Sequence, residues 1–381
     1  MNSCWHVITC EYPPQTGGVS CYTELVAGGL AACGDQVHVW CPLPGGSSAG
    51  VTVHGMLGRI RPGDLRRLGL ALNAFRTPRR ILVQWVPHGY GLRSMNVPFC
   101  LWLWMRASIR GDEVNLMVHE AYLGFWEGYW RQNVVAAVHR LMTVMLLRAA
   151  RRVWVSIPAW EDCLRPYRLG SRATFRWLPV PSNIPVSAQP AEVAVVRQAY
   201  LGGRRFLVGH LGIFSEQTAR LLKEIVPPLL DRAPESVMLL IGKDGEKHQE
   251  ALTSLAPHHR ARIHATGVLE TAELSRHLAA CDLAIQPYPD GISSRRTSAM
   301  AELAHGVPVV TTTGRLTEPL WLETGAVAAV PAGKAPEFVE AACRLLTDEA
   351  RRARLSARAK DLYDSRFDIR HVIAALRNES A

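Results

Sequence analysis

Short apolar runs alternate with longer segments of helical period along the first half of the chain. The longer segments predict helices, among them Val19–Ala32 and Trp130–Ala150. Strands that alternate with helices in this order are typical of a parallel sheet covered by helices. The apolar runs predict five buried strands, at Trp5–Cys10, Gln36–Cys41, Ile81–Val86, Val114–Val118 and Arg152–Ser156.

A second series of strands follows the proline-rich segment Leu178–Pro190, which has no helical period. The chain of 381 residues also exceeds the ~250–300 residues beyond which a single core usually splits. We therefore expect an α/β protein with a first lobe over residues 1–180, a linker over 181–190 and a second lobe over 191–366. The second series predicts strands at Phe206–Leu211, Val237–Ile241, Ile263–Thr266, Leu283–Gln286 and Val307–Thr312.

Charge is distributed unevenly between the two halves. Residues 1–185 contain 19 arginines and no lysine against 10 acidic residues, a net charge of +9, whereas the remainder is nearly neutral. Such a surface attracts an anionic substrate, the anionic inner leaflet of a membrane, or nucleic acid. Nucleic acid is the least favoured of the three, because no recognised binding motif accompanies the charge.

The chain shows no secretory signal at its start, so we expect a cytoplasmic protein. Its nine cysteines lack the paired spacing of zinc or redox motifs and are expected to be reduced core residues. Two stretches, Asn96–Arg106 and Trp130–Arg152, mix arginines with tryptophan and aliphatic residues. Neither reaches the ~18 apolar residues of a spanning helix. They are either basic helices lying on the inner face of a membrane or ordinary core-facing helices with solvated arginines.

The segment Gln286–Thr312 has the most specific chemistry in the chain. It predicts a strand end, a loop with the adjacent Arg295 and Arg296, and a helix that begins near Thr297. Backbone N–H groups at a helix start bind anions, and the arginines, Thr297 and Ser298 add charge and hydroxyl groups. The pattern predicts a phosphate cradle. The alternative is that the arginines form a solvated face.

The residues on both sides of this loop, Cys281-Asp-Leu-Ala-Ile-Gln-Pro-Tyr288 and Gly306-Val-Pro-Val-Val310, resemble the nucleotide-sugar site of glycosyltransferase family 4. The resemblance spans nearly the whole chain. It implies the GT-B architecture, in which two Rossmann-like parallel-sheet lobes face a central cleft and a last helix, here 367–381, crosses back to the N-terminal lobe. The first lobe would bind the acceptor and the second lobe the donor.

The implied activity is that of a retaining glycosyltransferase of the hexosyltransferase type. It would move a sugar from a nucleotide-diphosphate-sugar to an acceptor hydroxyl in the synthesis of a glycan, a lipid-linked saccharide or a glycosylated metabolite. No cofactor and no metal are expected, because this family neutralises the diphosphate with side chains and a helix dipole. The implied partners are the nucleotide sugar, a saccharide, lipid-linked or small-molecule acceptor and, at the periphery, an anionic membrane, but not nucleic acid.

The donor site departs from the family pattern. The family usually has two glutamates separated by seven residues, whose positions fall here on Ser293 and Ala301, and we assign the adjacent Glu302 to the donor site. The usual arginine and lysine of the preceding motif are replaced by His210 and Ser215. The paired arginines of the cradle are the expected substitutes, and His210 would add a hydrogen bond, or a charge if protonated.

The resemblance also implies roles for residues outside the cradle. Gly17 and Gly18, after Glu-Tyr-Pro-Pro, would face the phosphate and sugar of the donor. His119 and Glu120 follow a strand and are the implied catalytic residues, with Glu120 as base, acceptor-orienting group or scaffold. A capping pair at a helix start is the alternative. Backbone around Val268 would face the nucleobase, which the sequence does not identify.

Two other functions fit the same residues. A nucleotide-sugar epimerase of GT-B fold would share the cradle but need no acceptor. A catalytically silent partner subunit is favoured by the loss of the signature glutamates and of the arginine-lysine pair. The sugar, the acceptor and the oligomeric state do not follow from the sequence.

Overall fold

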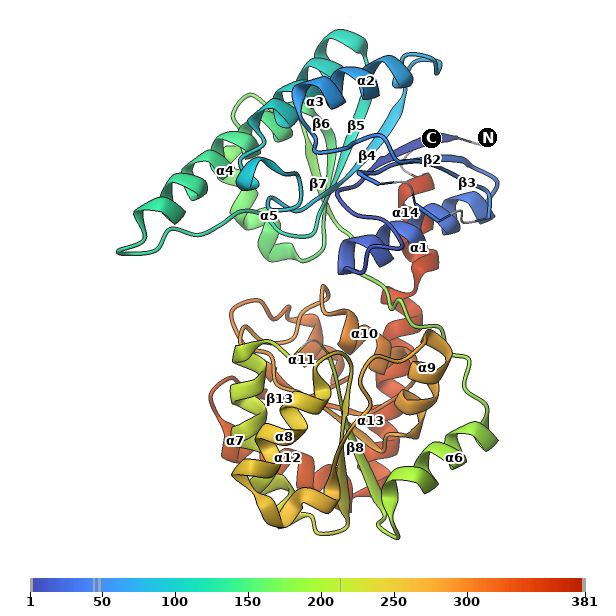
Figure 1. Ribbon diagram of the computed structural model, residues 1–381, viewed down its shortest axis with the longest axis vertical. Helices are drawn as coiled ribbons and strands as arrows, with labels where there is room; N and C mark the ends of the chain where they lie inside the picture. The colour runs from blue at the N-terminus through green and yellow to red at the C-terminus, as the bar shows by residue number, and fades with distance from the viewer. Residues whose placement is uncertain (1–2, 44, 47–48, 213, 379–381) are drawn as a thin grey trace. The chain divides into compact units, whose positions relative to one another are not determined.

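The computed structural model describes residues 3–43, 45–46, 49–212 and 214–378, and the chain divides into two compact units (Figure 1). Unit 1 comprises Met1–Pro179 and Ile369–Ala381, and unit 2 comprises Val180–Asp368. The first division therefore falls at the start of the proline-rich segment. Each unit is a Rossmann-like domain with one parallel sheet and covering helices, which confirms the predicted α/β fold class.

The sheet of unit 1 has seven strands in the order β3-β2-β1-β4-β5-β6-β7. The five predicted strands are present, with ends shifted by one or two residues. β3 and β7 were not predicted because they are half-exposed edge strands and so do not form apolar runs. The strands are β1 (Cys4–Ile8), β2 (Gln36–Trp40), β3 (Val51–His54), β4 (Arg80–Trp85), β5 (Glu113–Val118), β6 (Ala150–Val155) and β7 (Thr174–Trp177).

The helices of unit 1 include one that follows all of unit 2 in the chain. This helix, α14, packs on α1, where the side chain of Ile373 lies so close to Gly29 that a Cβ at that glycine would be 2.7 Å from Ile373 Cδ1. Arg377 Nε lies 3.1 Å from Asp35 Oδ2 in the same region. The helices are α1 (Gly18–Ala32), α2 (Pro62–Leu72), α3 (Val97–Arg110), α4 (Trp130–Ala149), α5 (Pro158–Leu164) and α14 (Ile369–Asn378).

The sheet of unit 2 has six strands in the order β10-β9-β8-β11-β12-β13. β8 and β11 are neighbours at the centre and are buried along their whole length. The strand order changes direction between them, and ligands bind at such a point in open α/β sheets. The strands are β8 (Phe206–Leu211), β9 (Ser236–Ile241), β10 (Ile263–Ala265), β11 (Leu283–Gln286), β12 (Val309–Thr313) and β13 (Ala328–Pro331).

The helices of unit 2 surround an aliphatic core that lies against the inner strands. Helix α10 begins at Thr297, as the sequence predicts. The predicted strand at Val307 begins two residues later, after Pro308, which has no N–H group to donate to a neighbouring strand. The helices are α6 (Pro190–Leu201), α7 (Glu216–Arg232), α8 (Gly245–Leu255), α9 (Thr271–Ala280), α10 (Thr297–Ala304), α11 (Leu320–Thr324), α12 (Ala335–Thr347) and α13 (Glu349–Leu362).

All nine cysteines are free thiols. Cys41, Cys100 and Cys281 are buried, as expected for core residues, whereas Cys33 is exposed and the other five are half-buried. The expectation of core cysteines therefore holds for only part of the set.

Candidate active site

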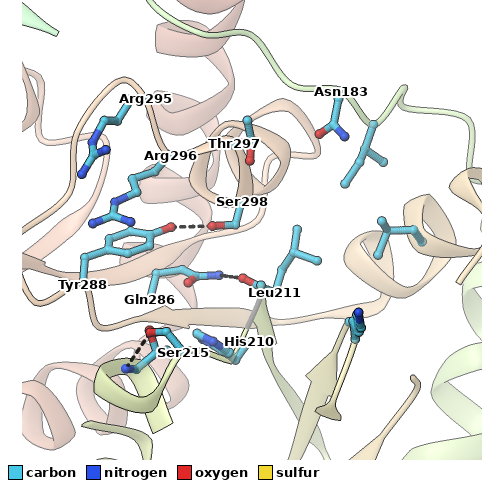
Figure 2. A pocket seen from close by; sticks show the side chains of 16 residues that line it. Asn183, His210, Leu211, Ser215, Gln286, Tyr288, Arg295, Arg296, Thr297 and Ser298 are labelled. Carbon is cyan, nitrogen blue, oxygen red and sulfur yellow. Dashed lines mark hydrogen bonds between the residues drawn. The ribbon is translucent and has the colours of Figure 1, made fainter. Parts of the chain in front are cut away.

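A pocket of ≈ 540 Å³ opens at the carboxyl ends of β8 and β11 in unit 2 (Figure 2). All of the residues that line it belong to unit 2. It lies at the reversal of strand order described above, and its volume falls within the ~300–1,000 Å³ of small-molecule sites. The fold therefore places this pocket where an α/β sheet binds ligands.

The loop between β11 and α10 supplies the cationic wall of this pocket. Arg295, Arg296, Thr297 and Ser298 all line it, and Figure 2 shows their side chains grouped at the start of α10. The Arg296 guanidinium lies 4.7 Å from the centroid of the Tyr288 ring, and the Tyr288 hydroxyl lies 2.7 Å from Ser298 Oγ. Two guanidinium groups beside the first amides of a helix form a site for an anion with several oxygens.

A buried carboxylate, that of Glu318, fixes this loop by hydrogen bonds to Ser294. Glu318 is 5 % exposed, and its Oε1 accepts a hydrogen bond of 2.9 Å from the backbone N–H of Ser294 and another from Ser294 Oγ. Its Oε2 accepts from Trp321 Nε1 at 2.8 Å, and burial raises the pKa of Glu318. Ser294 directly precedes the arginines, so the buried framework of unit 2 sets where their backbone lies.

His210, on β8, lines the pocket, and its predicted contact with a donor stays a prediction. Its Nδ1 lies 2.8 Å from the backbone oxygen of Ile285 on β11. A carbonyl oxygen only accepts, so Nδ1 carries the proton and Nε2 presents a lone pair. Burial lowers the pKa of His210 to about 4, which leaves the ring neutral near pH 7. His210 therefore adds no positive charge at neutral pH, although the sequence allows one.

Glu302 is buried in α10 and does not line the pocket, contrary to its expected contact with the donor. Gln286 does line the pocket, and its Nε2 donates to Glu302 Oε1 at 2.6 Å and to the backbone oxygen of Leu211 at 2.8 Å. Burial raises the pKa of Glu302 to about 8, so the carboxyl group is mostly protonated at neutral pH. Its contribution to the pocket is to orient Gln286.

The structure does not bring Val268 to the pocket. Val268 is 78 % exposed and is absent from the pocket lining, whose aliphatic side chains are Ile184, Leu211 and Leu274. The predicted contact of the backbone around Val268 with a nucleobase stays a prediction. Lys243 and Asn183 also line the pocket, whereas the sequence alone favours Lys243 as a surface residue rather than a ligand. Lys243 follows β9, and its place after a strand of a parallel sheet is a signal that could have identified it.

In unit 1, the start of α1 already holds a carboxylate. Glu11 Oε1 accepts from the backbone N–H of Ser20 at 2.9 Å, and a Cβ at Gly17 would overlap the Glu11 carboxylate. Gly17 is therefore explained by this close approach. Gly18 has open space where a side chain would be. Their predicted contact with a donor stays a prediction.

His119 and Glu120 follow β5 at the carboxyl edge of the sheet of unit 1. His119 Nε2 lies 2.9 Å from Gln84 Oε1, the Tyr22 ring packs edge-on at 4.8 Å, and burial lowers the pKa of His119 to about 3. His119 is thus a fixed, neutral imidazole, and Glu120 Oε2 lies 3.4 Å from His88 Nδ1. The next helix begins only at residue 130, so the alternative of a capping pair at a helix start does not hold.

Among the residues that the structure describes, only Asp231, His258 and His259 cluster like metal ligands. They lie outside the pocket. Arg262 Nη2 donates to His259 Nδ1 at 2.6 Å, which puts the proton of His259 on Nε2, the nitrogen that lies 2.8 Å from Asp231 Oδ1. A nitrogen that carries a proton has no lone pair for a metal, so the contact is better described as a hydrogen bond from the neutral His259 ring to the Asp231 carboxylate.

Two parallel-sheet Rossmann-like units, one with an arginine-lined pocket at its switch point, match the arrangement of GT-B glycosyltransferases. Residues 205–348, all within unit 2, match the family model described as "Glycosyl transferases group 1". No curated protein matches the chain in sequence.

Solved structures of low sequence identity share the whole fold. Sucrose-phosphate synthase from Thermosynechococcus elongatus matches with a TM-score of 0.72 at 17% identity, covering 100% of this chain and 98% of that one. HepE from Anabaena, in complex with UDP and glucose, matches with a TM-score of 0.67 at 15% identity, covering 100% of this chain and 99% of that one. WaaG, a glycosyltransferase involved in lipopolysaccharide biosynthesis, matches with a TM-score of 0.65 at 14% identity, covering 98% of this chain and 99% of that one. These likenesses confirm the predicted GT-B fold and, with the family match, support a glycosyltransferase.

Proposed function

We propose that the protein is a glycosyltransferase that binds a nucleotide-diphosphate-sugar in the pocket of unit 2 and transfers the sugar to an acceptor hydroxyl. The observation that carries this proposal is the pair Arg295 and Arg296 at the start of α10 within one pocket. When the bond between the anomeric carbon and the diphosphate oxygen breaks, negative charge develops on the diphosphate. Guanidinium groups and helix amides fixed beside that charge stabilise the transition state.

The transfer itself exchanges one bond for another. The acceptor oxygen bonds to the anomeric carbon as the bond to the diphosphate breaks, and the proton of the acceptor hydroxyl leaves to a phosphate oxygen or to water. In keeping with the family 4 resemblance, the configuration at the anomeric carbon is retained. The arginines, with Lys243 in the same pocket lining, supply the charge that magnesium supplies in other transferases, so transfer needs no metal.

A panel of UDP, GDP and ADP, each with and without its glucose ester, tests this function. A ligand that binds only the folded protein raises its melting temperature, and the rise grows with the ratio of ligand concentration to Kd. We expect one nucleotide series to stabilise the protein. Incubation of the matching nucleotide sugar alone then separates the candidate activities: slow release of nucleoside diphosphate indicates a transferase, and a changed sugar indicates an epimerase. Binding without turnover, even with acceptors, indicates a silent subunit.

Unit 1, which we propose binds the acceptor, exposes a group of aromatic side chains. We define the aromatic loop of unit 1 as residues 122–134, in which Phe125, Trp126, Tyr129 and Trp130 are each 58–69 % exposed. The loop and the first part of α4 project from the sheet of unit 1 (Figure 1). In contrast, the aromatic side chains at 99 and 102 of the earlier basic stretch are buried. Of the four exposed aromatic residues, only Trp130 belongs to the second basic stretch, and the first stretch exposes the aliphatic side chains of Leu101 and Met105.

Side-chain contacts hold the aromatic loop in shape. Asn133 bonds the backbone of Trp126 through its oxygen at 2.8 Å and its nitrogen at 2.9 Å, and the Arg140 guanidinium lies 3.9 Å from the centroid of the Phe125 ring. Exposed aromatic rings beside arginines fit the interface of an anionic membrane. Unit 1 thus meets the membrane through this loop, and a lipid-linked saccharide is the acceptor that this contact favours. No helix in the described ranges is both long and apolar enough to cross a bilayer.

A further inference from the structure

The pocket of unit 2 contains a buried acceptor to which no group of the described residues donates. His210 is 2 % exposed, and its Nε2 has no hydrogen-bond partner among the described residues. The ring lines the pocket, and its Nε2 is the atom nearest to where a Cβ would stand on Gly212, another lining residue. A buried lone pair without a partner costs stability, so such an atom in a pocket indicates that a ligand supplies the missing donor.

The neighbouring strand fixes which kind of ligand atom can pair with this nitrogen. Because the backbone oxygen of Ile285 holds the proton on Nδ1, the neutral ring faces the pocket with a lone pair. Phosphate oxygens at neutral pH are acceptors, and two acceptors in contact repel each other. Burial is the main cause that lowers the pKa of His210, and the neighbouring His248 lowers it further.

We infer that His210 accepts a hydrogen bond from a hydroxyl group of the bound nucleotide sugar and so selects the hydroxyl-bearing part of the donor rather than its phosphates. This inference rests on the proposed function. Two parts of the pocket then bind different parts of the donor. The arginines and the start of α10 hold the diphosphate, and His210 on β8 accepts a hydrogen bond from a sugar or ribose hydroxyl. The sugar and the ribose both carry hydroxyl groups that can donate to Nε2, so the experiment separates the two sources.

Three variants test the role of His210, with UDP and UDP-glucose as the probes. His210→Phe keeps a flat ring but removes the acceptor, whereas His210→Gln can place an oxygen near the position of Nε2. His248→Asn is the matched control, because His248 stacks on Phe214 at 4.8 Å but does not line the pocket. Calorimetry measures each Kd, and thermal unfolding shows that each variant is folded.

We expect His210→Phe to weaken binding by at least about tenfold, the scale of a buried hydrogen bond left unmade, and His210→Gln to recover much of the loss. A loss confined to UDP-glucose places the hydroxyl on the transferred sugar. An equal loss for UDP and UDP-glucose places it on the ribose. Unchanged affinity of folded His210→Phe for both ligands, or an equal loss in His248→Asn, overturns the inference.

Proton uptake provides an independent readout. Calorimetry near pH 7 in buffers of different ionisation enthalpy should show no proton taken up on binding to the unaltered protein, because His210 stays neutral. Uptake that disappears in His210→Gln would mean that a protonated ring binds phosphate, and would overturn the inference while leaving the proposed function intact. If the unaltered protein binds neither UDP, GDP, ADP nor their glucose esters, the proposed function fails, which is a different result from any of these.

Discussion

The two units share one architecture but use their positive charge in different ways. In unit 2, which is nearly neutral, two arginines stand in a pocket and a buried Glu318 fixes the loop that bears them. In unit 1, arginine is abundant, yet the buried Arg79 and Arg106 are paired internally with Asp112 at 2.7 and 2.5 Å. Net charge therefore does not locate a small-ligand site in this protein. A few cationic side chains on a rigid loop form such a site. Many cationic side chains spread over a surface instead create a positive potential that attracts a large anionic partner.

We expect the largest effect from removing the two arginines of the unit 2 pocket. Replacing both Arg295 and Arg296 by alanine should weaken UDP binding by at least ~2 kcal/mol, or about 30-fold, because two charge-assisted contacts are lost. Calorimetry measures the change. The control is the double alanine variant of Arg351 and Arg354, which removes the same charge from the exposed face of α13. Equal affinities of the two double variants would contradict the cradle, and neither should alter vesicle binding.

The reciprocal test removes the aromatic loop. Replacing Trp126 and Trp130 by serine should reduce binding to anionic vesicles by about tenfold or more, because each exposed ring loses its insertion at the interface. Co-sedimentation with neutral and anionic lipids at low and high salt is the measurement, since contacts with charged lipids weaken as salt screens them. Leu70→Ser with Leu169→Ser removes exposed apolar groups elsewhere in unit 1 as the control. Negligible binding of the unaltered protein in all four conditions would favour a soluble acceptor, and UDP affinity should not change.

A fall in pH should lower the free energy of unfolding of unit 1, because unit 1 contains buried histidines. Burial lowers the pKa of His6 and of His119 to about 3, well below the ordinary value near 6.5. The unfolded chain therefore binds protons first as the pH falls below about 6.5, and each such histidine removes about 1.4 kcal/mol of stability per pH unit. Urea unfolding at several pH values between about 5 and 7 measures this slope. His6→Asn should make it shallower by about that amount, and an unchanged slope would show that His6 is protonated in the folded protein.

The smallest expected effect concerns metal. If arginines and helix amides stabilise the leaving diphosphate, EDTA should change the transfer rate by less than about twofold. The assay compares chelated protein with and without added magnesium. Loss of transfer that magnesium restores would mean that the cations of unit 2 are insufficient for the leaving group.

The parts of the fold and site that the sequence predicts are those encoded by adjacent residues. The central strands are apolar runs, and the cradle is the contiguous stretch from Arg295 to Ser298, so both could be predicted. The edge strands β3 and β7 could not, because half-exposed strands lack an apolar signal. Nor could the link from Glu318 to Ser294, whose partners are 24 residues apart and meet only in the fold. The neutral state of His210 was also hidden, since it depends on a carbonyl of the neighbouring strand.

The packing of α14 on α1 has a consequence for the order in which the protein is completed. Every strand of unit 2 precedes α14 in the chain, so a ribosome synthesises all of unit 2 before it makes the helix that covers Gly29. Until then the apolar partners of Val372, Ile373 and Leu376 stay exposed in unit 1. The C-terminal unit can therefore finish its core while the N-terminal unit waits for its last helix, the reverse of the usual N-to-C sequence of domain folding during translation.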